Sequence, residues 1–395
     1  MDLLKVTEDK TQPRPESRDL RVEPLGKQHS RWGRRLLGLG VAIVAGVAVL
    51  IWGMRLYPRT LPEPLPEVAL ITSAVSLFLV VPATVAGGLA AFAWRIGWRW
   101  VAGATAAVSL LLLLGVILPW ATQANTAAEH NVPLSLSGYM ANPDPGKPTH
   151  TVTYTVSGAE QLQLDVWQAD SPSRDRLGVV WAHGGGWVSG DRANWSLPKW
   201  GRWMSDSGTT MFSVDYRLPT SGSGMGALTP DMKAREAADV KCALGWVQAH
   251  AAEYGVDPTN LVLAGDSAGA HLALLTAYTI GTPNLQPSCP VNVVPVKAVV
   301  SLYGITYSNN PAEADVMPIN YVRQGLPPTL LIQGVNDHTV APDNAPRMAS
   351  QLAASGDEYE IVQLPFTDHF FDIYWGSFSA QLARGLVQQL LNRYQ

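Results

Sequence analysis

The spacing of hydrophobic residues divides the chain into two parts. Three long apolar stretches without acidic or basic residues occupy positions 36–54, 68–94 and 100–120. Each is about as long as the roughly 20 residues that an α-helix needs to cross the hydrocarbon core of a bilayer. From about residue 149 onward, short apolar runs alternate with segments of helical periodicity. We therefore expect a membrane region with three transmembrane helices, followed by a separate α/β domain.

The basic residues around the apolar stretches predict their orientation. Lys and Arg precede the first stretch, fill the loop between the second and third, and are absent after the third until residue 147. Because such residues favour the cytoplasmic side, we expect a multi-pass protein of the cell membrane with a cytoplasmic N-terminus and an extracytoplasmic C-terminal domain. A cleaved signal peptide is the alternative for the first stretch, but that stretch lies behind 35 mostly polar residues and lacks a small-x-small exit.

The organisation that follows has four parts. Residues 1–30 are polar and charged, which predicts a disordered cytoplasmic tail. Residues 31–121 form the membrane region, and 122–149, which contain several prolines, are expected to be a linker. Residues 150–395 are expected to be the catalytic domain.

The pattern of the C-terminal part predicts a mostly parallel, eight-stranded sheet with helices on both faces, because short buried strands alternate with helices. The expected strands are 151–156, 162–167, 178–182, 211–215, 261–264, 296–302, 329–332 and 359–364. The expected helices include one around residues 195–200 and others at 232–254, 268–278, 345–354 and 378–394. In such sheets ligands bind beyond the carboxyl ends of the strands.

The sequence Gly265-Asp266-Ser267-Ala268-Gly269 carries the strongest chemical signal. Gly-x-Ser-x-Gly between a strand and a helix is typical of a nucleophile elbow, a sharp turn that exposes a serine hydroxyl above the sheet. Here a buried strand precedes the motif and a helix follows it. Ser267 is therefore the candidate nucleophile, with Asp266 as a supporting residue.

A serine nucleophile needs a base and an acid that orients the base. In this type of fold both follow the serine along the chain. His369 lies between the last expected strand and the last helix, where the base belongs; His271 and His338 are the alternatives. Asp337 follows the penultimate strand and is the preferred acid, with Asp343 and Asp368 as competitors.

The charge that develops on the carbonyl oxygen requires backbone N–H donors. The run His183-Gly184-Gly185-Gly186 follows an expected strand, and its glycines allow the main chain to approach a substrate closely. We expect Gly184 and Gly185, together with Ala268, to form the oxyanion hole. Gly186 supports the loop, and His183 is expected to brace it through a side-chain hydrogen bond.

Charge and cysteine content narrow the classes of function. The formal net charge of −4 gives no basic footprint, so nucleic acid is not an expected partner. No group of Cys and His has zinc-ligand spacing, and no metal site is expected. Cys242 and Cys289 are the only cysteines. Since Cys242 falls within an expected helix, a buried free thiol is the expected state, and a disulfide is the alternative.

These motifs, with Val214-Asp-Tyr-Arg-Leu218, resemble the hormone-sensitive-lipase-type branch of the α/β-hydrolases, and more narrowly a bacterial group of feruloyl-esterase-like enzymes and carboxylesterases. The resemblance covers residues from about 150 to 395. It implies an α/β-hydrolase fold and hydrolysis of carboxylic esters without metal or organic cofactor. It also implies a triad of Ser267, Asp337 and His369.

Two features depart from the family pattern. Leu218 leads into Pro-Thr-Ser-Gly-Ser-Gly, and only about 25 residues separate the strands near 302 and 329, so any cap is small. An open site suits esters with short acyl chains or bulky polar groups. We therefore expect a membrane-anchored serine esterase or lipase acting on a small-molecule or lipid ester. An amidase, formamidase or peptidase of the same fold, and a non-catalytic binding module, are the alternatives. The oligomeric state stays open.

Overall fold

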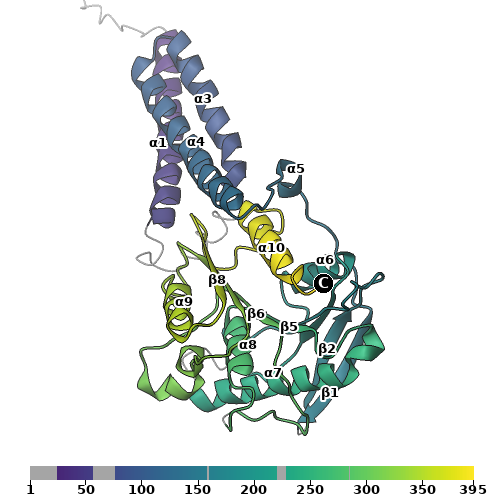
Figure 1. The fold of residues 1–395 in the computed structure, drawn as a ribbon. Helices are drawn as coiled ribbons and strands as arrows, with labels where there is room; N and C mark the ends of the chain where they lie inside the picture. Colours follow the sequence, from purple (N-terminus) through teal and green to yellow (C-terminus); the bar gives the residue numbers. More distant parts are fainter. Residues whose placement is uncertain (1–24, 57–75, 158–159, 220–227, 284) are drawn as a thin grey trace, which may run out of the picture.

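The computed structural model describes residues 25–56, 76–157, 160–219, 228–283 and 285–395. Most of the expected N-terminal tail, and positions 68–75 of the second apolar stretch, lie outside these residues. The described chain forms a bundle of long helices that continues into an α/β domain (Figure 1).

The N-terminal bundle contains α1 (Leu25–Leu56), the short 3₁₀ helix η2 (Ser76–Leu79), α3 (Val80–Arg95) and α4 (Arg99–Glu129). Small residues such as Ala48 and Ala83 are fully buried where the helices meet, and Ser109 donates a hydrogen bond to the Ala83 carbonyl at 2.8 Å. Many larger apolar side chains face outward instead. This arrangement, with small residues inside and apolar residues outside, is typical of helices that associate in lipid.

Two helical segments are long and apolar enough to cross a membrane, Ser76–Arg95 and Arg99–Glu129. The apolar part of α1 is shorter, Gly38–Gly53. At 1.5 Å per residue it covers about 24 Å, which is less than the hydrocarbon thickness of about 30 Å. The expectation of three spans is therefore supported for two helices.

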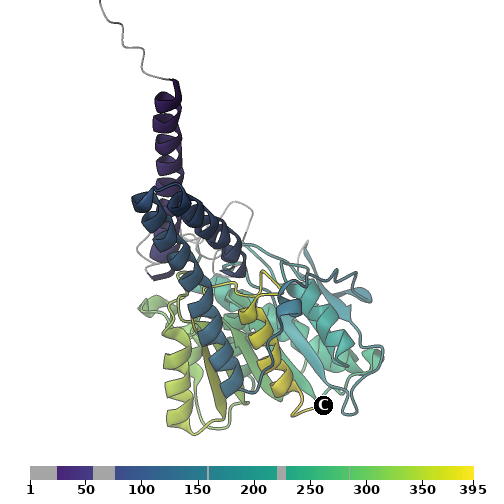
Figure 2. The ribbon, with the colours of Figure 1, turned by 90° about the horizontal axis from the view of Figure 1, so that it is seen from above.

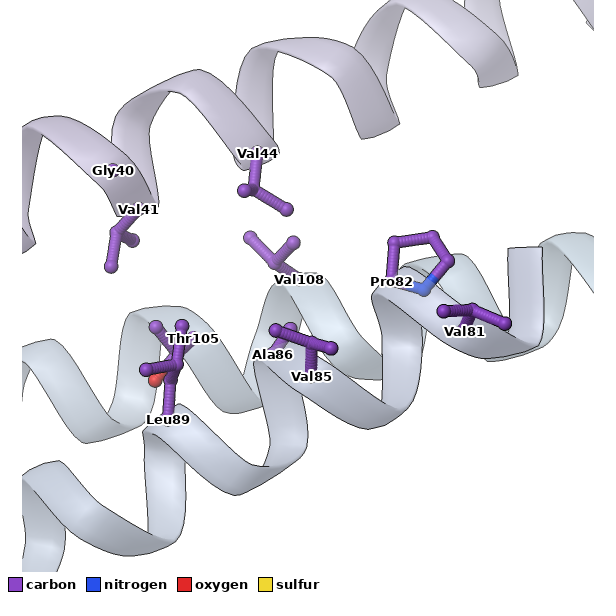
Figure 3. A pocket seen from close by; sticks show the side chains of 10 residues that line it. All are labelled: Gly40, Val41, Val44, Val81, Pro82, Val85, Ala86, Leu89, Thr105 and Val108. Atoms are coloured by element: carbon purple, nitrogen blue, oxygen red, sulfur yellow. The ribbon is translucent and has the colours of Figure 1, made fainter. Parts of the chain in front are cut away.

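An apolar pocket of about 270 Å³ lies between α1, α3 and α4. Its walls include Val41, Val85 and Val108, as Figure 3 shows. The hydroxyl of Thr105, the one polar side chain in the lining, already donates to the Val101 carbonyl at 2.8 Å. The pocket is confined to the bundle and contains none of the residues expected to perform chemistry.

The helix α4 runs past the expected domain boundary. Residues 122–129, expected to be part of a linker, are helical, and Gln123 and Ala127 are buried against the α/β domain. In Figure 2 this part of α4 runs alongside α10 (Phe378–Leu391). The segment is rich in alanine, which favours helix, and its small side chains fit closely against α10. A short helix, α5 (Leu136–Tyr139), follows before the first strand.

One eight-stranded sheet forms the centre of the domain, in the order β1-β2-β4-β3-β5-β6-β7-β8. The β1–β2 and β2–β4 pairs are antiparallel and the other pairs are parallel. The mostly parallel sheet of the sequence analysis is therefore confirmed. The strands are β1 (His150–Ser157), β2 (Glu160–Trp167), β3 (Gly178–Ala182), β4 (Thr210–Val214), β5 (Leu261–Asp266), β6 (Ala298–Leu302), β7 (Thr329–Gly334) and β8 (Tyr359–Leu364).

Helices cover both faces of the sheet, as expected. One face packs on α7 (Pro230–His250), α8 (Ala268–Tyr278) and α9 (Asn344–Ser355). The other packs on α6 (Leu197–Asp206), α10 and the end of α4. Successive strand residues alternate between the two cores; Val179 faces the α6 side and Val180 the α7 side. The five central strands are buried throughout, which explains their uninterrupted apolar runs.

The expectation of a free thiol at Cys242 is wrong. Cys242 on α7 forms a disulfide with Cys289, with the two Cα atoms 5.5 Å apart. The segment after α8 folds back onto α7, so closely that a Cβ on Gly245 would come within 2.5 Å of Val291. This contact joins positions 47 residues apart, and helical periodicity alone does not reveal it.

Candidate active site

Ser267 occupies a sharp turn between β5 and α8. Its backbone has φ 50° and ψ −120°, a strained conformation for a residue with a side chain. The flanking residues must be glycines, because the turn leaves no room for a Cβ atom at either position. A Cβ on Gly265 would lie 2.4 Å from the carbonyl carbon of Gly269, and a Cβ on Gly269 would lie 2.1 Å from the Ala182 carbonyl oxygen. The turn therefore has the geometry that the Gly-x-Ser-x-Gly motif predicts.

Three expected residues meet at this turn. The Nε2 atom of His369 lies 2.9 Å from Ser267 Oγ, and its Nδ1 atom lies 2.8 Å from an Asp337 carboxylate oxygen. All three side chains are buried. Because a carboxylate only accepts, Nδ1–H donates to Asp337, which leaves Nε2 as the acceptor for the serine hydroxyl.

The Asp337 carboxylate is held by further donors. The backbone N–H groups of Thr339 and Val340 donate to Oδ1 at 3.0 and 2.7 Å, and the Gln333 amide donates to Oδ2 at 2.7 Å. These bonds fix the position of the carboxylate beside the imidazole.

The competing residues are engaged elsewhere. His271 accepts from the indole N–H of Trp187 and contacts the Val316 carbonyl at 2.7 Å; burial lowers its pKa to about 3, so it is neutral. His338 pairs with Asp368 at 2.7 Å. Asp343 bonds Arg347 near the surface. Neither histidine is hydrogen-bonded to Ser267, and neither carboxylate is the partner of His369 Nδ1, which bonds Asp337.

In the glycine loop after β3, Gly184 does not have the free N–H group that an oxyanion donor needs. The N–H of Gly184 donates to the Asp266 carboxylate at 3.0 Å, so it is not directed at a substrate oxygen. Among the described residues, the N–H groups of Gly185 and Gly186 have no hydrogen-bond partner. Both residues have positive φ, 128° and 61°. The free donors of this loop are therefore one residue further along than predicted.

Asp266 links the glycine loop to the turn at Ser267, because it directly precedes Ser267 and accepts from the Gly184 N–H. Its other carboxylate oxygen accepts from the Trp181 indole N–H at 2.9 Å. Burial, together with the nearby carboxylate of Asp372, raises the pKa of Asp266 to about 7. Asp372 is itself surrounded by donors, among them the hydroxyl of Tyr303 at 2.6 Å.

His183 braces the loop by the kind of contact that was expected. Its Nδ1 atom lies 2.7 Å from the Gly184 carbonyl, and its ring stacks on Tyr216 at 4.2 Å. The Tyr216 hydroxyl donates to the His183 carbonyl at 2.8 Å. Burial lowers the pKa of His183, so the ring stays neutral.

The sequence analysis missed a group of aromatic residues around the site. Tyr303 lies with its ring 4.6 Å from that of His369, and Phe370 stacks on Trp195 at 4.2 Å. Five aromatic residues of this region have positive φ, which is rare for bulky side chains: Trp187, Trp195, Tyr303, Phe366 and Phe370. Trp187 directly follows the glycine run, but no motif marks the others.

Two charged residues on α7 were also missed. Lys233 lies over the Trp187 ring at 4.3 Å and bonds Glu313 of the β6–β7 connection at 3.0 Å. Glu236 is fully buried, and its carboxylate oxygens have no hydrogen-bond partner in the described structure. Burial raises the pKa of Glu236 to about 9. Among the described residues, no group of three or more His, Cys, Asp or Glu could hold a metal ion.

Comparison with known proteins connects this geometry to esterases. The family model BD-FAE matches residues 164–314. The chain is 28% identical over 262 residues to the probable carboxylic ester hydrolase LipM of Mycobacterium tuberculosis, covering 58% of each protein. It is also 28% identical to esterase LipC of the same organism, over 57% of this chain and 60% of the relative. The chain thus spans less than two thirds of the length of these relatives.

Solved structures give the same picture. Native esterase 2 of Thermogutta terrifontis is 25% identical, with a TM-score of 0.53, and the match covers 63% of this chain and 93% of that enzyme. The propionate-bound form is 25% identical, with a TM-score of 0.52, over 63% and 96% of the two chains. The matches extend over most of the neighbour's length, and they support the α/β-hydrolase fold with a mixed eight-stranded sheet.

Proposed function

Since the chain has an α/β-hydrolase domain of the esterase family, we propose that it is a serine hydrolase that cleaves carboxylic esters through an acyl-enzyme intermediate. The observation that carries the proposal is the hydrogen-bonded line from Ser267 through His369 to Asp337, with distances of 2.9 and 2.8 Å. The similarity to LipM and LipC supports the same reaction class.

In the first step, Ser267 Oγ attacks the carbonyl carbon of the ester while its proton passes to His369 Nε2. The imidazolium that forms is stabilised by Asp337, which accepts from Nδ1–H. Collapse of the tetrahedral intermediate breaks the bond to the alkoxy oxygen, which takes the proton from Nε2 and leaves as alcohol.

The negative charge on the carbonyl oxygen needs donors that are already in place. We assign this role to the N–H of Ala268, at the start of α8, and to the unpaired N–H groups of Gly185 and Gly186. Gly184 keeps its bond to Asp266 and acts by holding the loop.

In the second step, water attacks the acyl carbon with His369 as the base, which releases the acid and restores Ser267. The β6–β7 connection is short and contains two 3₁₀ turns, Pro311–Val316 and Pro318–Tyr321. Its Val316 carbonyl contacts His271, which lies one turn after Ser267 on α8. A small cap of this kind suits a short acyl group or a bulky polar ester. The propionate bound to esterase 2 is a short acid of the same class.

The test is Ser267→Ala assayed on p-nitrophenyl acetate. We expect kcat to fall by several orders of magnitude, about 10⁵–10⁶-fold, with the fold retained. A fluorophosphonate probe should label the wild type and the control Ser350→Ala, which alters an exposed serine on α9, but not Ser267→Ala. Full activity of Ser267→Ala would contradict the proposal.

We further propose that α1, α3 and α4 anchor the enzyme in the membrane, with the catalytic domain outside the cytoplasm. Two of these helices are long and apolar enough to span a bilayer, and α1 packs against α4. The distribution of Lys and Arg supports a cytoplasmic N-terminus. The Cys242–Cys289 disulfide supports the same orientation, because disulfides persist in oxidising compartments.

Labelling of intact cells tests this topology. A membrane-impermeant maleimide should label Ser350→Cys in intact cells and Lys10→Cys only after permeabilisation. The reverse pattern would place the catalytic domain in the cytoplasm and overturn this part of the proposal, independently of the hydrolase activity.

A further inference from the structure

The helix α4 joins the α/β domain at the loop that carries the candidate base. This base loop, residues 365–377 between β8 and α10, contains His369. The buried amide of Gln123 donates to the Pro365 carbonyl at 3.1 Å and to Thr367 Oγ1 at 3.2 Å. Thr367 precedes His369 by only two residues. The end of the bundle and the proposed active site therefore share one loop.

A second helix of the bundle reaches the same loop. The ring of Phe78, in η2 just before α3, lies 6.1 Å from the ring of Tyr374 in the base loop. The N–H of Leu77 donates to the hydroxyl of Tyr139, and the Tyr374 hydroxyl donates to the Tyr139 carbonyl at 2.6 Å. Figure 1 shows the bundle beyond this end of the domain, with α10 starting beside α4.

The position of Gln123 along α4 indicates how far its contact with the base loop lies from the surface of the proposed bilayer. It follows Trp120, the last residue of the apolar stretch, by three residues, or about 4.5 Å of helix rise. Trp120 is 45% exposed, and tryptophan prefers the membrane–water interface. The base loop would therefore lie at the level of the lipid headgroups, and Ser267, whose Oγ is 2.9 Å from His369 Nε2 of that loop, would lie close to the same level.

Exposed apolar side chains lie in the base loop and against it. Trp195 is 54% exposed and stacks on Phe370, the neighbour of His369. Ile373 in the base loop is 40% exposed, and its N–H bonds the Phe370 carbonyl at 3.0 Å. Met140, directly after α5, is also exposed. Such residues are favourable where they contact lipid and unfavourable in water.

We propose that the site takes its substrate from the membrane surface: the substrate is an ester of an amphiphile anchored in the outer leaflet, with the scissile bond at headgroup depth. Trp195 and Ile373 form the edge that rests on the lipid. This inference rests on the hydrolase activity and membrane orientation proposed above, and it names the substrate class of the same site. An ester of a short acid with a lipid-anchored alcohol would fit under the small cap, and its scissile bond would lie at headgroup depth.

The first test measures how close the base loop lies to the lipid headgroups, and it does not depend on activity. Because Cys242 and Cys289 are paired, Ile373→Cys offers one free thiol for an environment-sensitive fluorophore. Val294→Cys is the matched control, since Val294 is 38% exposed and lies before β6, at the opposite end of the sheet. In phosphatidylcholine vesicles with headgroup nitroxides, the fluorophore at 373 should be quenched and that at 294 should not. Equal quenching would overturn the inference.

The second test uses the full-length protein reconstituted in phosphatidylcholine vesicles. It is given two acetyl esters whose leaving groups have the same chemistry. One is the soluble acetate of methylumbelliferone, and the other is the vesicle-held acetate of heptadecylumbelliferone. For Ile373→Glu we expect hydrolysis of the vesicle-held ester to fall about tenfold and that of the soluble ester to stay within about twofold, because the added charge weakens contact with lipid. Val294→Glu should leave both rates unchanged.

The remaining outcomes separate failure of the membrane inference from failure of the ester hydrolase proposal. If Ile373→Glu matches the wild type on the vesicle-held ester, or loses both activities equally, Ile373 has no role at the membrane and the inference fails. Hydrolysis of the soluble ester alone by the wild type also overturns it, while leaving the ester hydrolase proposal in place. If neither ester is cleaved and a fluorophosphonate does not label Ser267, the proposed function itself is wrong.

Discussion

The backbone N–H of Gly184 donates to the carboxylate of Asp266 at 3.0 Å. This bond joins the glycine loop after β3 to the residue directly before Ser267. Parallel pairing makes it possible, because Ala182 lies opposite Gly265 in the sheet, so the residues that follow each strand are neighbours. The relative position of the proposed oxyanion donors and the nucleophile therefore depends on a buried carboxylate.

Asp266→Asn should lower kcat about 10- to 100-fold and change KM less than about threefold. Trp181 and Gly184 donate to different oxygens of Asp266, so asparagine would present an NH2 donor to one of these two N–H groups. A displacement of the loop by a fraction of an ångström is costly in the transition state. The measurement is steady-state kinetics beside thermal unfolding. Asp372→Asn is the control: it alters another buried carboxylate, and its main effect should be on stability.

Asp337→Asn should reduce kcat about 10³- to 10⁴-fold, because an amide at this position no longer fixes the imidazole tautomer in which Nε2 accepts from Ser267. Asp368→Asn, beside His338 and also close to His369 in sequence, should cost less than about tenfold. Both rates are measured on one soluble acetyl ester. A larger effect of Asp368→Asn would exchange the roles of the two carboxylates.

Gly185→Ala should abolish most activity, by at least about 100-fold, since a Cβ there would lie 1.9 Å from the Ser189 carbonyl oxygen and push the loop away. Gly325→Ala is a matched control, because Gly325 also has positive φ, 90°, but no atom within 4 Å of its Cβ position. Both variants carry backbone strain, so a difference in kcat between them isolates the close approach. Circular dichroism checks that both are folded.

Glu236 gives a prediction for stability against pH. Burial raises the pKa of Glu236 to about 9, from an ordinary value near 4.5. Between these values the native state keeps a proton that the unfolded chain has lost, so the stability contributed is complete below pH 4.5 and decreases as pH rises towards 9. Glu236→Gln removes this titration. Relative to the variant, the free energy of unfolding of the wild type should fall by about 1.4 kcal/mol per pH unit across this window.

Denaturant titrations in detergent between pH 5 and pH 9 measure that slope. Glu253→Gln serves as the control, because the Glu253 side chain is 64% exposed. If the wild type and Glu236→Gln have parallel pH profiles, the Glu236 carboxyl is ionised in the native state and a partner for it must exist.

Loss of the disulfide should destabilise the domain by about 2–4 kcal/mol, as expected for a link that closes a loop of this size. Replacement of both Cys242 and Cys289 by alanine should lower the unfolding midpoint. A reductant should shift the midpoint of the wild type but not that of the double variant. An unchanged wild-type midpoint in reductant would show that the bond adds no stability.

Local patterns predicted the elements of the α/β domain well for a physical reason. Central strands such as β3 and β5 are buried on both faces, so each is a short apolar run. The motif around Ser267 needs a strand before it and a helix after it, and both are present. The order of serine, acid and histidine then left only a few residues to choose from. Of these, His369 is the histidine that bonds Ser267, and Asp337 is the carboxylate that bonds the His369 ring.

The features that were missed depend on contacts between distant segments. The bond from Gly184 to Asp266 follows from the β3–β5 register, and the disulfide follows from the return of the segment after α8 onto α7. The buried Gln123 amide finds its acceptors on the base loop and α10, where Pro365, Thr367 and Ser379 each place an oxygen within hydrogen-bonding distance of Nε2. A polar residue just beyond an apolar stretch is ordinary in a sequence, so its role becomes visible only when the two regions are seen together.

Proline at position 119 lies inside the continuous helix α4, one turn before Gln123. Proline has no N–H to donate to the preceding turn, so the helix is least stiff at this point and can bend there. With α4 embedded as proposed, a bilayer thicker or thinner than the helix would change its tilt. A bend at Pro119 would absorb part of that change, so that the α/β domain keeps its height and orientation over membranes of different composition.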